Sequence, residues 1–207
     1  MGSVLVLSRE IERRDPSMLC HSERVTAIAQ TIAEWLRCGR RELGAIALGG
    51  PLHDIGKLTI ADAVLLKPGR LDPGELEQIH RHPLEGARML HGVHVLRAAL
   101  PCVLHHHERW DGGGYPHGLA GTAIPRVARI LAVADAFDAM TSTRPYRSAL
   151  AVEAALAEVS CCAGTQFDPE ASGAFLAAWD AGEVELLQAR ASPRPRASCA
   201  SARSPRR

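Results

Sequence analysis

Along most of this chain, apolar residues recur at every third or fourth position, and Gly- and Pro-rich stretches separate the segments that show this spacing. Such spacing places apolar side chains on one face of an α-helix, whereas the strict alternation of a half-buried strand never runs long here. The pattern therefore predicts an all-α protein, a compact bundle of about seven helices. These helices are expected at residues 17–37, 41–54, 82–91, 94–107, 124–140, 149–163 and 169–187.

A long loop rich in Gly and Pro, residues 108–125, joins two of the predicted helices. One interpretation is a flexible connector. The other is a functional loop, because loops of this length inside compact domains usually carry function. Trp110 and Tyr115 favour the second, since each offers a flat surface for a base, a partner or the rest of the loop.

Composition narrows the class of protein. The 207 residues are 46% hydrophobic and 23% charged with a net charge of +1, which is typical of a globular domain and gives no reason to expect a nucleic acid polymer as partner. The chain contains no run of 18 apolar residues, so we expect no membrane span. The six cysteines form no C-x-x-C pair, so we interpret them as reduced thiols in a cytoplasmic protein.

Charge is uneven at the C-terminus, where residues 190–207 contain six arginines and no acidic residue. We expect a short leader at 1–15, a folded domain at 16–188 and a disordered basic tail at 189–207. The tail is either a solvated segment or an arm for an anionic partner.

Five of the apolar stripes carry His or Asp at or near one end. A single His on such a face is more often a core histidine, and a buried Asp is unfavourable unless it is paired or binds a metal. Five stripes together favour a metal site inside the bundle. A mixed imidazole and carboxylate set suits Fe, Mn, Zn or Co, and a pair of such ions would promote attack on a phosphoryl group.

Three basic residues flank these stripes. Lys57 follows the His53-Asp54 pair by one turn, where it either stabilises a helix C-terminus or neutralises charge at a phosphate. Arg144 and Arg147 follow the helix that carries Asp135, and either form a solvated basic turn or clamp an anionic substrate.

The order and spacing of several motifs resemble the HD-GYP domain, a branch of the HD phosphohydrolase superfamily. The matching segments are HSERV at 21–25, LHDIGK at 52–57, LLKPGRL at 65–71, HRHPLEGARML at 80–90, HHERWDGGGYPHGLAG at 106–121 and IPRVARILAVADAFDAMTSTRPYR at 124–147. The resemblance implies an HD-domain helical bundle that hydrolyses cyclic di-GMP to pGpG, GMP or both, by attack of a hydroxide that bridges metal ions. Such sites hold two metals, sometimes three, commonly iron or manganese.

Carried over by position, the resemblance implies roles for particular residues. Asp54 would bridge the metals and act in catalysis with Lys57, while Tyr115, Arg144 and Arg147 would bind the substrate. Members with three metals have a Glu where this chain has Ser17, so two ions are expected. The full set of metal ligands would be His21, His53, Asp54, His82, His106, His107 and Asp135.

Two other functions stay open at this point. One is an HD phosphohydrolase that acts on another cyclic or ordinary nucleotide. The other is a non-catalytic module that binds cyclic di-GMP or a cyclase. The family's GYP loop, here Gly114-Tyr115-Pro116, is linked to contacts with diguanylate cyclase domains, so such a domain is an expected partner, and a homodimer is a further expectation.

Overall fold

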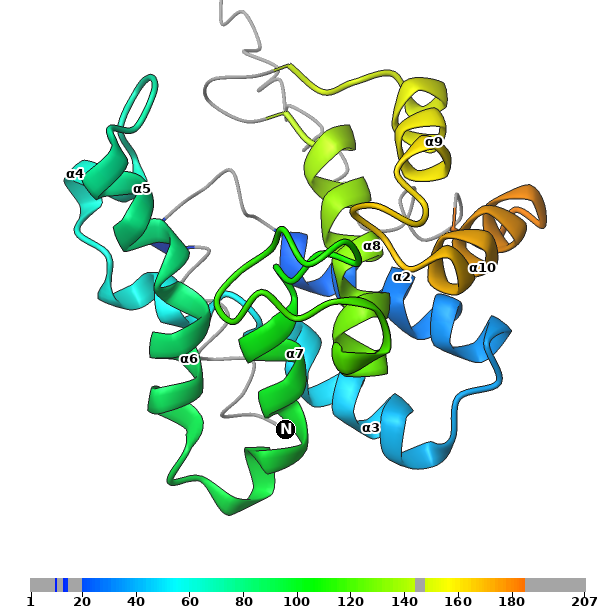
Figure 1. The fold of residues 1–207 in the computed structure, drawn as a ribbon, viewed down its shortest axis with the longest axis horizontal. Coiled ribbons are helices and arrows are strands. Elements are labelled where there is room, and N and C mark those ends of the chain that lie inside the picture. The colour runs from blue at the N-terminus through cyan, green and yellow to red at the C-terminus, as the bar shows by residue number, and fades with distance from the viewer. Residues whose placement is uncertain (1–9, 11–12, 15–19, 144–147, 185–207) are drawn as a thin grey trace, which may run out of the picture.

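The computed structural model describes residues 10, 13–14, 20–143 and 148–184, and within them it contains helices and one isolated bridge but no strand (Figure 1). The prediction of an all-α fold is confirmed. The α-helices are α2 (His21–Trp35), α3 (Arg40–Gly49), α4 (Asp62–Leu65), α5 (Pro73–His80), α6 (His82–Leu90), α7 (Leu100–His105), α8 (Arg126–Thr141), α9 (Val152–Cys161) and α10 (Pro169–Asp180). The 3₁₀ helices are η2 (Gly50–Leu52), η3 (Ile55–Thr59), η4 (His94–Ala99) and η5 (Gly121–Ala123).

Helix α8 runs through the middle of the bundle and packs against α2, with α9 and α10 beside it (Figure 1). These helices share the larger hydrophobic core, in which Ile28, Ile32, Leu131, Phe137 and Phe175 are fully buried. The Phe137 and Phe175 rings lie 4.7 Å apart between centroids. Burial of their apolar faces is what holds these helices together, at about 1.5–3 kcal/mol for each large side chain.

A smaller core joins η2, η3, α6, η4 and α7, and consists of Leu52, Ile55, Leu90, Leu96 and Val103. Here η3 and α6 approach so closely that a Cβ on Gly56 would lie 1.9 Å from the His82 carbonyl oxygen. Only glycine permits this contact. It brings the residues just before Gly56 next to the first turn of α6.

The chain around His53 and Asp54 differs from the prediction of one helix over 41–54. Helix α3 ends at Gly49, and His53 and Asp54 form a turn between η2 and η3. Pro51 explains the difference, because it lacks the N–H group that would donate to the carbonyl oxygen of Ala47 and continue the α-helix. The predicted helix over 94–107 is likewise a 3₁₀ helix followed by α7, which starts with Pro101 in its first turn.

Two helices that the prediction missed, α4 and α5, project on the side of the bundle away from α9 and α10 (Figure 1). Helix α5 has no buried residue and therefore shows no apolar stripe. Its N-terminus nevertheless has a recognisable capping box, since Asp72 accepts from the Glu75 backbone N–H and Glu75 accepts from that of Asp72.

The predicted leader and basic tail lie outside the described residues, except for Glu10, Arg13 and Arg14. Arg14 donates to the carbonyl oxygens of Leu58 and Ile60 at 2.9 and 2.8 Å, at the end of η3. The domain boundaries stay a prediction. None of the helices in the described ranges combines the length and the apolar character needed to cross a membrane.

Candidate metal centre

The structure brings all seven predicted metal ligands together in one place. They come from the start of α2, the turn between η2 and η3, the start of α6, the residues after α7 and the middle of α8. Elements of both hydrophobic cores therefore contribute ligands. These predicted ligands are His21, His53, Asp54, His82, His106, His107 and Asp135.

The seven side chains form two groups that share Asp54. Its Oδ1 lies 3.3 Å from His82 Nε2 and 3.8 Å from His106 Nε2, and His107 completes this first group. Its Oδ2 lies 3.4 Å from His53 Nε2, in the second group. One carboxylate thus presents each of its oxygens to a different set of nitrogens, which is the arrangement of a ligand that bridges two ions.

The second group contains His21, His53 and Asp54, and Asp135 joins it from α8. Asp135 Oδ1 lies 3.3 Å from His21 Nε2 and 3.9 Å from His53 Nε2. This group therefore offers two imidazole nitrogens and two carboxylates.

Backbone carbonyl groups fix the orientation of three imidazole rings. The Nδ1 of His53 lies 2.7 Å from Gly50 O, that of His82 lies 2.7 Å from Ile79 O, and that of His106 lies 3.0 Å from Val103 O. A carbonyl oxygen only accepts, so each Nδ1 carries the hydrogen. Each Nε2 then directs a lone pair into the cluster, which is how the outer partners of metal-binding histidines usually orient them.

Two of the inward nitrogens lie in direct contact. His82 Nε2 and His106 Nε2 are 3.2 Å apart. This is close to the separation of two nitrogens that are each about 2.1 Å from one ion. His21 Nε2, His53 Nε2 and Asp54 Oδ1 are buried and have no hydrogen-bond partner in the described part of the chain. The residues present therefore fit divalent cations of the Fe, Mn or Zn type.

Electrostatics prepare most of these groups to bind a cation. Burial lowers the pKa of His107 to about 3 and that of His106 well below its ordinary value, so both are neutral ligands near pH 7. Burial would raise the pKa of Asp54, but the neighbouring Lys57 ammonium outweighs it and helps to hold that pKa well below its usual range. The contact with His21 does the same for the pKa of Asp135. Both carboxylates are therefore ionised.

His21 is the exception among the ligands. Its burial lowers its pKa, yet contacts with the carboxylates of Asp135 and Asp138 outweigh that effect and raise the pKa to about 9. In the ion-free chain its ring is thus a cation between carboxylates. A metal that binds Nε2 must displace this proton, which couples metal affinity to pH.

Sequence reasoning gave no role to Asp138, although it lies on the same face of α8 as Asp135. The structure buries Asp138 behind His21, where its Oδ2 accepts from His21 Nδ1 at 2.7 Å and from Arg24 Nη2 at 3.0 Å. It therefore orients the His21 ring and fixes its tautomer. The sequence held one signal for this role, because Asp138 follows Asp135 by three residues and so lies on the same face of the helix.

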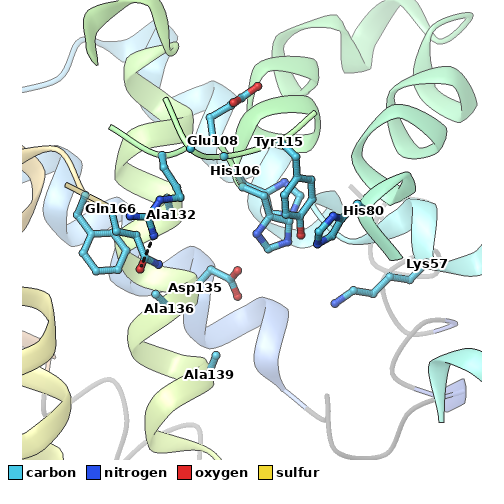
Figure 2. A pocket seen from close by; sticks show the side chains of 15 residues that line it. Lys57, His80, His106, Glu108, Tyr115, Ala132, Asp135, Ala136, Ala139 and Gln166 are labelled. Carbon is cyan, nitrogen blue, oxygen red and sulfur yellow. Dashed lines mark hydrogen bonds between the residues drawn. The ribbon is translucent and has the colours of Figure 1, made fainter. Parts of the chain in front are cut away.

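A cavity of about 450 Å³ opens beside the metal ligands, and Asp135, Lys57, His80 and Tyr115 line it together with His106 and His107 (Figure 2). Lys57 lies within η3 rather than at the end of an α-helix, and its Nζ donates to Asp54 Oδ2 at 2.7 Å. The cavity has the size of a small-molecule site.

Tyr115 packs its ring against two histidines of this cavity. Its centroid lies 4.1 Å from that of His80 and 4.9 Å from that of His107, and both ring pairs are stacked. The bond between Tyr115 and Pro116 is cis. The aromatic residue of the long loop thus contacts a metal ligand directly.

The long loop is anchored, which disagrees with its interpretation as a flexible connector. The buried Glu108 carboxylate accepts from the backbone N–H groups of His117 and Leu119 at 2.9 and 3.0 Å. The guanidinium carbon of Arg129 lies over the Trp110 ring, 5.6 Å from the centroid of that ring. A Cβ on Gly114 would come 2.3 Å from the Arg109 nitrogen, so the turn before Tyr115 requires glycine.

Arg144, Arg147 and Ser17 lie outside the described residues. The expectations that depend on them stay predictions: a clamp for substrate phosphates, and two metal ions rather than three.

The fold and the buried His and Asp cluster define a helical domain of the kind that binds divalent metals. The HD domain family matches residues 5–171 of this chain. The cyclic di-GMP phosphodiesterase response regulator RpfG of Xanthomonas campestris is 45% identical over 82% of this chain and 46% of its own length. A cyclic di-GMP phosphodiesterase of Thermotoga maritima is 42% identical over 83% of this chain and 47% of its own.

Solved structures share the fold. A cyclic GMP-AMP specific phosphodiesterase of Vibrio cholerae, V-cGAP3, has a TM-score of 0.64 at 19% identity, over 84% of this chain and 49% of that one. An HDG"Y"P protein of Bdellovibrio bacteriovorus has a TM-score of 0.62 at 17% identity, over 79% and 52%. This chain belongs to the HD domain family, and the prediction of its HD-GYP branch is confirmed. It spans about half the length of the curated relatives that it matches.

Proposed function

We propose that this domain hydrolyses cyclic di-GMP to pGpG, GMP or both, at a centre of two divalent metal ions held by the seven ligands. The observation that carries the proposal is the sharing of Asp54 between two ligand groups, three of whose other members, His106, His107 and Asp135, line a cavity large enough for a nucleotide. Relatives named cyclic di-GMP phosphodiesterases, at 45% and 42% identity, support the choice of substrate.

The ions would be held by His82, His106 and His107 on one side and by His21, His53 and Asp135 on the other, with Asp54 between them. When bound, such a pair lowers the pKa of water and neutralises charge that develops on a phosphoryl group. Iron or manganese agrees with the mixed nitrogen and oxygen ligands.

Lys57 supplies the chain's own cation at the cavity. Its ammonium group is held by Asp54, and Lys57 lines the same cavity as Asp135. We assign it two roles, which are to neutralise charge on the phosphate in the transition state and to donate a proton to the departing 3′ oxygen. Arg144 and Arg147, assigned from the family motif, would hold the other phosphate oxygens through paired hydrogen bonds.

Tyr115 would bind the substrate from the long loop. Because stacking against His80 and His107 restrains its ring, the ring offers a preorganised surface beside the cavity. We keep a diguanylate cyclase domain as the proposed partner of the Gly114-Tyr115-Pro116 loop, and a cytoplasmic location and a homodimer as further proposals.

A related cyclic dinucleotide is the second candidate substrate, because relatives at 34% identity are named 3′3′-cGAMP-specific phosphodiesterases. The experiment is product analysis of protein purified without oxygen and loaded with manganese or iron, incubated with cyclic di-GMP, 3′3′-cGAMP or a linear dinucleotide. We expect pGpG or GMP to appear from cyclic di-GMP. Metal-loaded protein that leaves cyclic di-GMP intact would refute the proposal, and turnover of 3′3′-cGAMP alone would reassign the substrate.

Lys57→Ala tests the mechanism within the same assay. The substitution should lower kcat by about 10²–10³-fold, as loss of one electrostatic group at a transition state does, while the metal content stays unchanged. Lys67→Ala is the matched control, because Lys67 pairs with Glu75 away from the cavity and should leave kcat unchanged. Equal activity of Lys57→Ala and the wild type would remove Lys57 from the mechanism.

A further inference from the structure

A second cluster of metal-binding side chains lies outside the centre described above. It consists of His105, at the end of α7, and Glu108 and His117, at the two ends of the segment that contains Tyr115. Glu108 lines the cavity, but Figure 2 shows its carboxylate pointing away from Lys57 and Asp135. The cluster is therefore separate from the proposed catalytic centre, although His105 is adjacent to His106 in the chain.

Distances within this cluster are too long for hydrogen bonds between its side chains. Glu108 Oε1 lies 3.6 Å from His105 Nδ1 and 3.9 Å from His117 Nδ1. Two ligands that are each about 2.0–2.1 Å from a tetrahedral ion lie roughly 3.3–3.5 Å apart. A small rotation of either ring would close the difference. The atoms are thus spaced as ligands of one ion rather than as hydrogen-bonded partners.

A buried negative charge and a buried nitrogen without a hydrogen-bond partner at this position also indicate a cation. The Glu108 side chain is fully buried, and no Lys or Arg of the described ranges forms an ion pair with it. His105 Nδ1 is buried without a hydrogen-bond partner among the described residues. A buried carboxylate beside an unpaired imidazole nitrogen is stabilised when a cation binds both.

We propose that His105, Glu108 and His117 bind a zinc ion that fastens the long loop to the end of α7. Two imidazole nitrogens and one carboxylate form a ligand set typical of zinc, with the fourth position open to water because the His117 side chain is 46% exposed. The ion would join residues 105 and 117 across the turn that contains Tyr115. Zinc would thereby stabilise the loop wall of the cavity without entering the catalytic centre.

The test compares the wild type with His117→Ala. Alanine keeps the backbone N–H that donates to Glu108, so the loop's own hydrogen bonds remain. His94→Ala, at an exposed histidine of η4, is the matched control. Each protein is stripped with chelator and titrated with zinc, the bound ions are counted by native mass spectrometry, and amide exchange of residues 112–120 is followed.

We expect the wild type and His94→Ala to bind one zinc ion more than His117→Ala. The free zinc concentration is set about 100 times above the dissociation constant of this site. Loop amides that exchange only when the site opens should then exchange about 100-fold more slowly in the wild type, and zinc should give no such slowing in His117→Ala. His105→Ala should lose the same ion. An equal zinc count in the wild type and His117→Ala, or equal slowing of loop exchange, would overturn the proposal. Neither readout depends on hydrolysis, so the proposed function can fail without affecting this result.

Discussion

Asp138 provides a sharp test of how the chain prepares its metal ligands, since it touches His21 but belongs to neither ligand group. We consider Asp138→Asn. The amide still accepts a hydrogen bond from His21 Nδ1, but it carries no negative charge to polarise that imidazole or to pair with Arg24. The affinity for the ion on the His21 side should therefore fall while the ligands themselves remain.

The expected size of this effect follows from the role of the carboxylate. Loss of an outer-shell partner of a ligating histidine typically weakens metal binding by about 10–100-fold, which corresponds to about 1.4–2.8 kcal/mol. The free energy of unfolding of the metal-free protein should also fall, by about 1.5–3 kcal/mol, because the hydrogen bond from Arg24 Nε to the charged Asp138 Oδ1 is lost.

Competition titration with a chromophoric chelator measures the dissociation constants of both ions. Asp168→Asn is the matched control, because Asp168 is also buried and paired with an arginine of α8, Arg129, yet lies at the start of α10. Asparagine keeps its helix cap, so this variant should lose stability without losing metal affinity.

An unchanged affinity in Asp138→Asn would refute the reasoning. Equal losses of affinity in Asp138→Asn and Asp168→Asn would refute it as well, because they would show that general destabilisation, rather than the contact with His21, weakens metal binding.

Three further predictions concern packing, pH and the loop. Gly56→Ala places a Cβ 1.9 Å from the His82 carbonyl oxygen, so the free energy of unfolding should fall by about 3 kcal/mol in thermal unfolding, and bound metal should be lost. Gly92→Ala is the control, because Gly92 has open space around it, and it should change neither quantity. Urea unfolding of the metal-free protein should give a maximum stability near pH 6.5. Folding lowers the pKa of His107 to about 3, so stability falls as the pH drops below 6.5, where the unfolded chain takes up a proton. Folding raises the pKa of His21 to about 9, so stability also falls as the pH rises from 6.5 to 9. A steady rise of stability from pH 5 to 8.5 would contradict these assignments. Tyr115→Phe keeps the ring stacking and should bind metal like the wild type in the same chelator titration, and a tenfold loss would assign a role to the hydroxyl.

Helical periodicity and motif spacing both report which side chains face inward, so the side chains predicted as metal ligands could be expected to lie together. The stripe on α8 placed Asp135 toward the bundle interior, and the structure brings it within 3.3 Å of His21 Nε2. Motif order did the same for His53 and Asp54, although their local structure was predicted wrongly. A turn between two 3₁₀ helices leaves no periodic signal over so few residues.

Contacts between distant segments could not be predicted in the same way. The role of Asp138 depends on the packing of α8 against α2, and the cluster around Glu108 depends on how the long loop folds back on itself. Helix α5 was missed for another reason, since it buries no residue and its sequence signals are local ones, the capping box and Pro73 at its first position.

The central claim is that Asp54 lies between two ions, each held by a different group of ligands. Anomalous diffraction from crystals of the manganese-loaded protein tests this claim most directly. The account predicts two anomalous peaks, one beside His82, His106 and His107 and the other beside His21, His53 and Asp135, with the Asp54 carboxylate in contact with both. A single peak, or two peaks of which one does not contact Asp54, would contradict it.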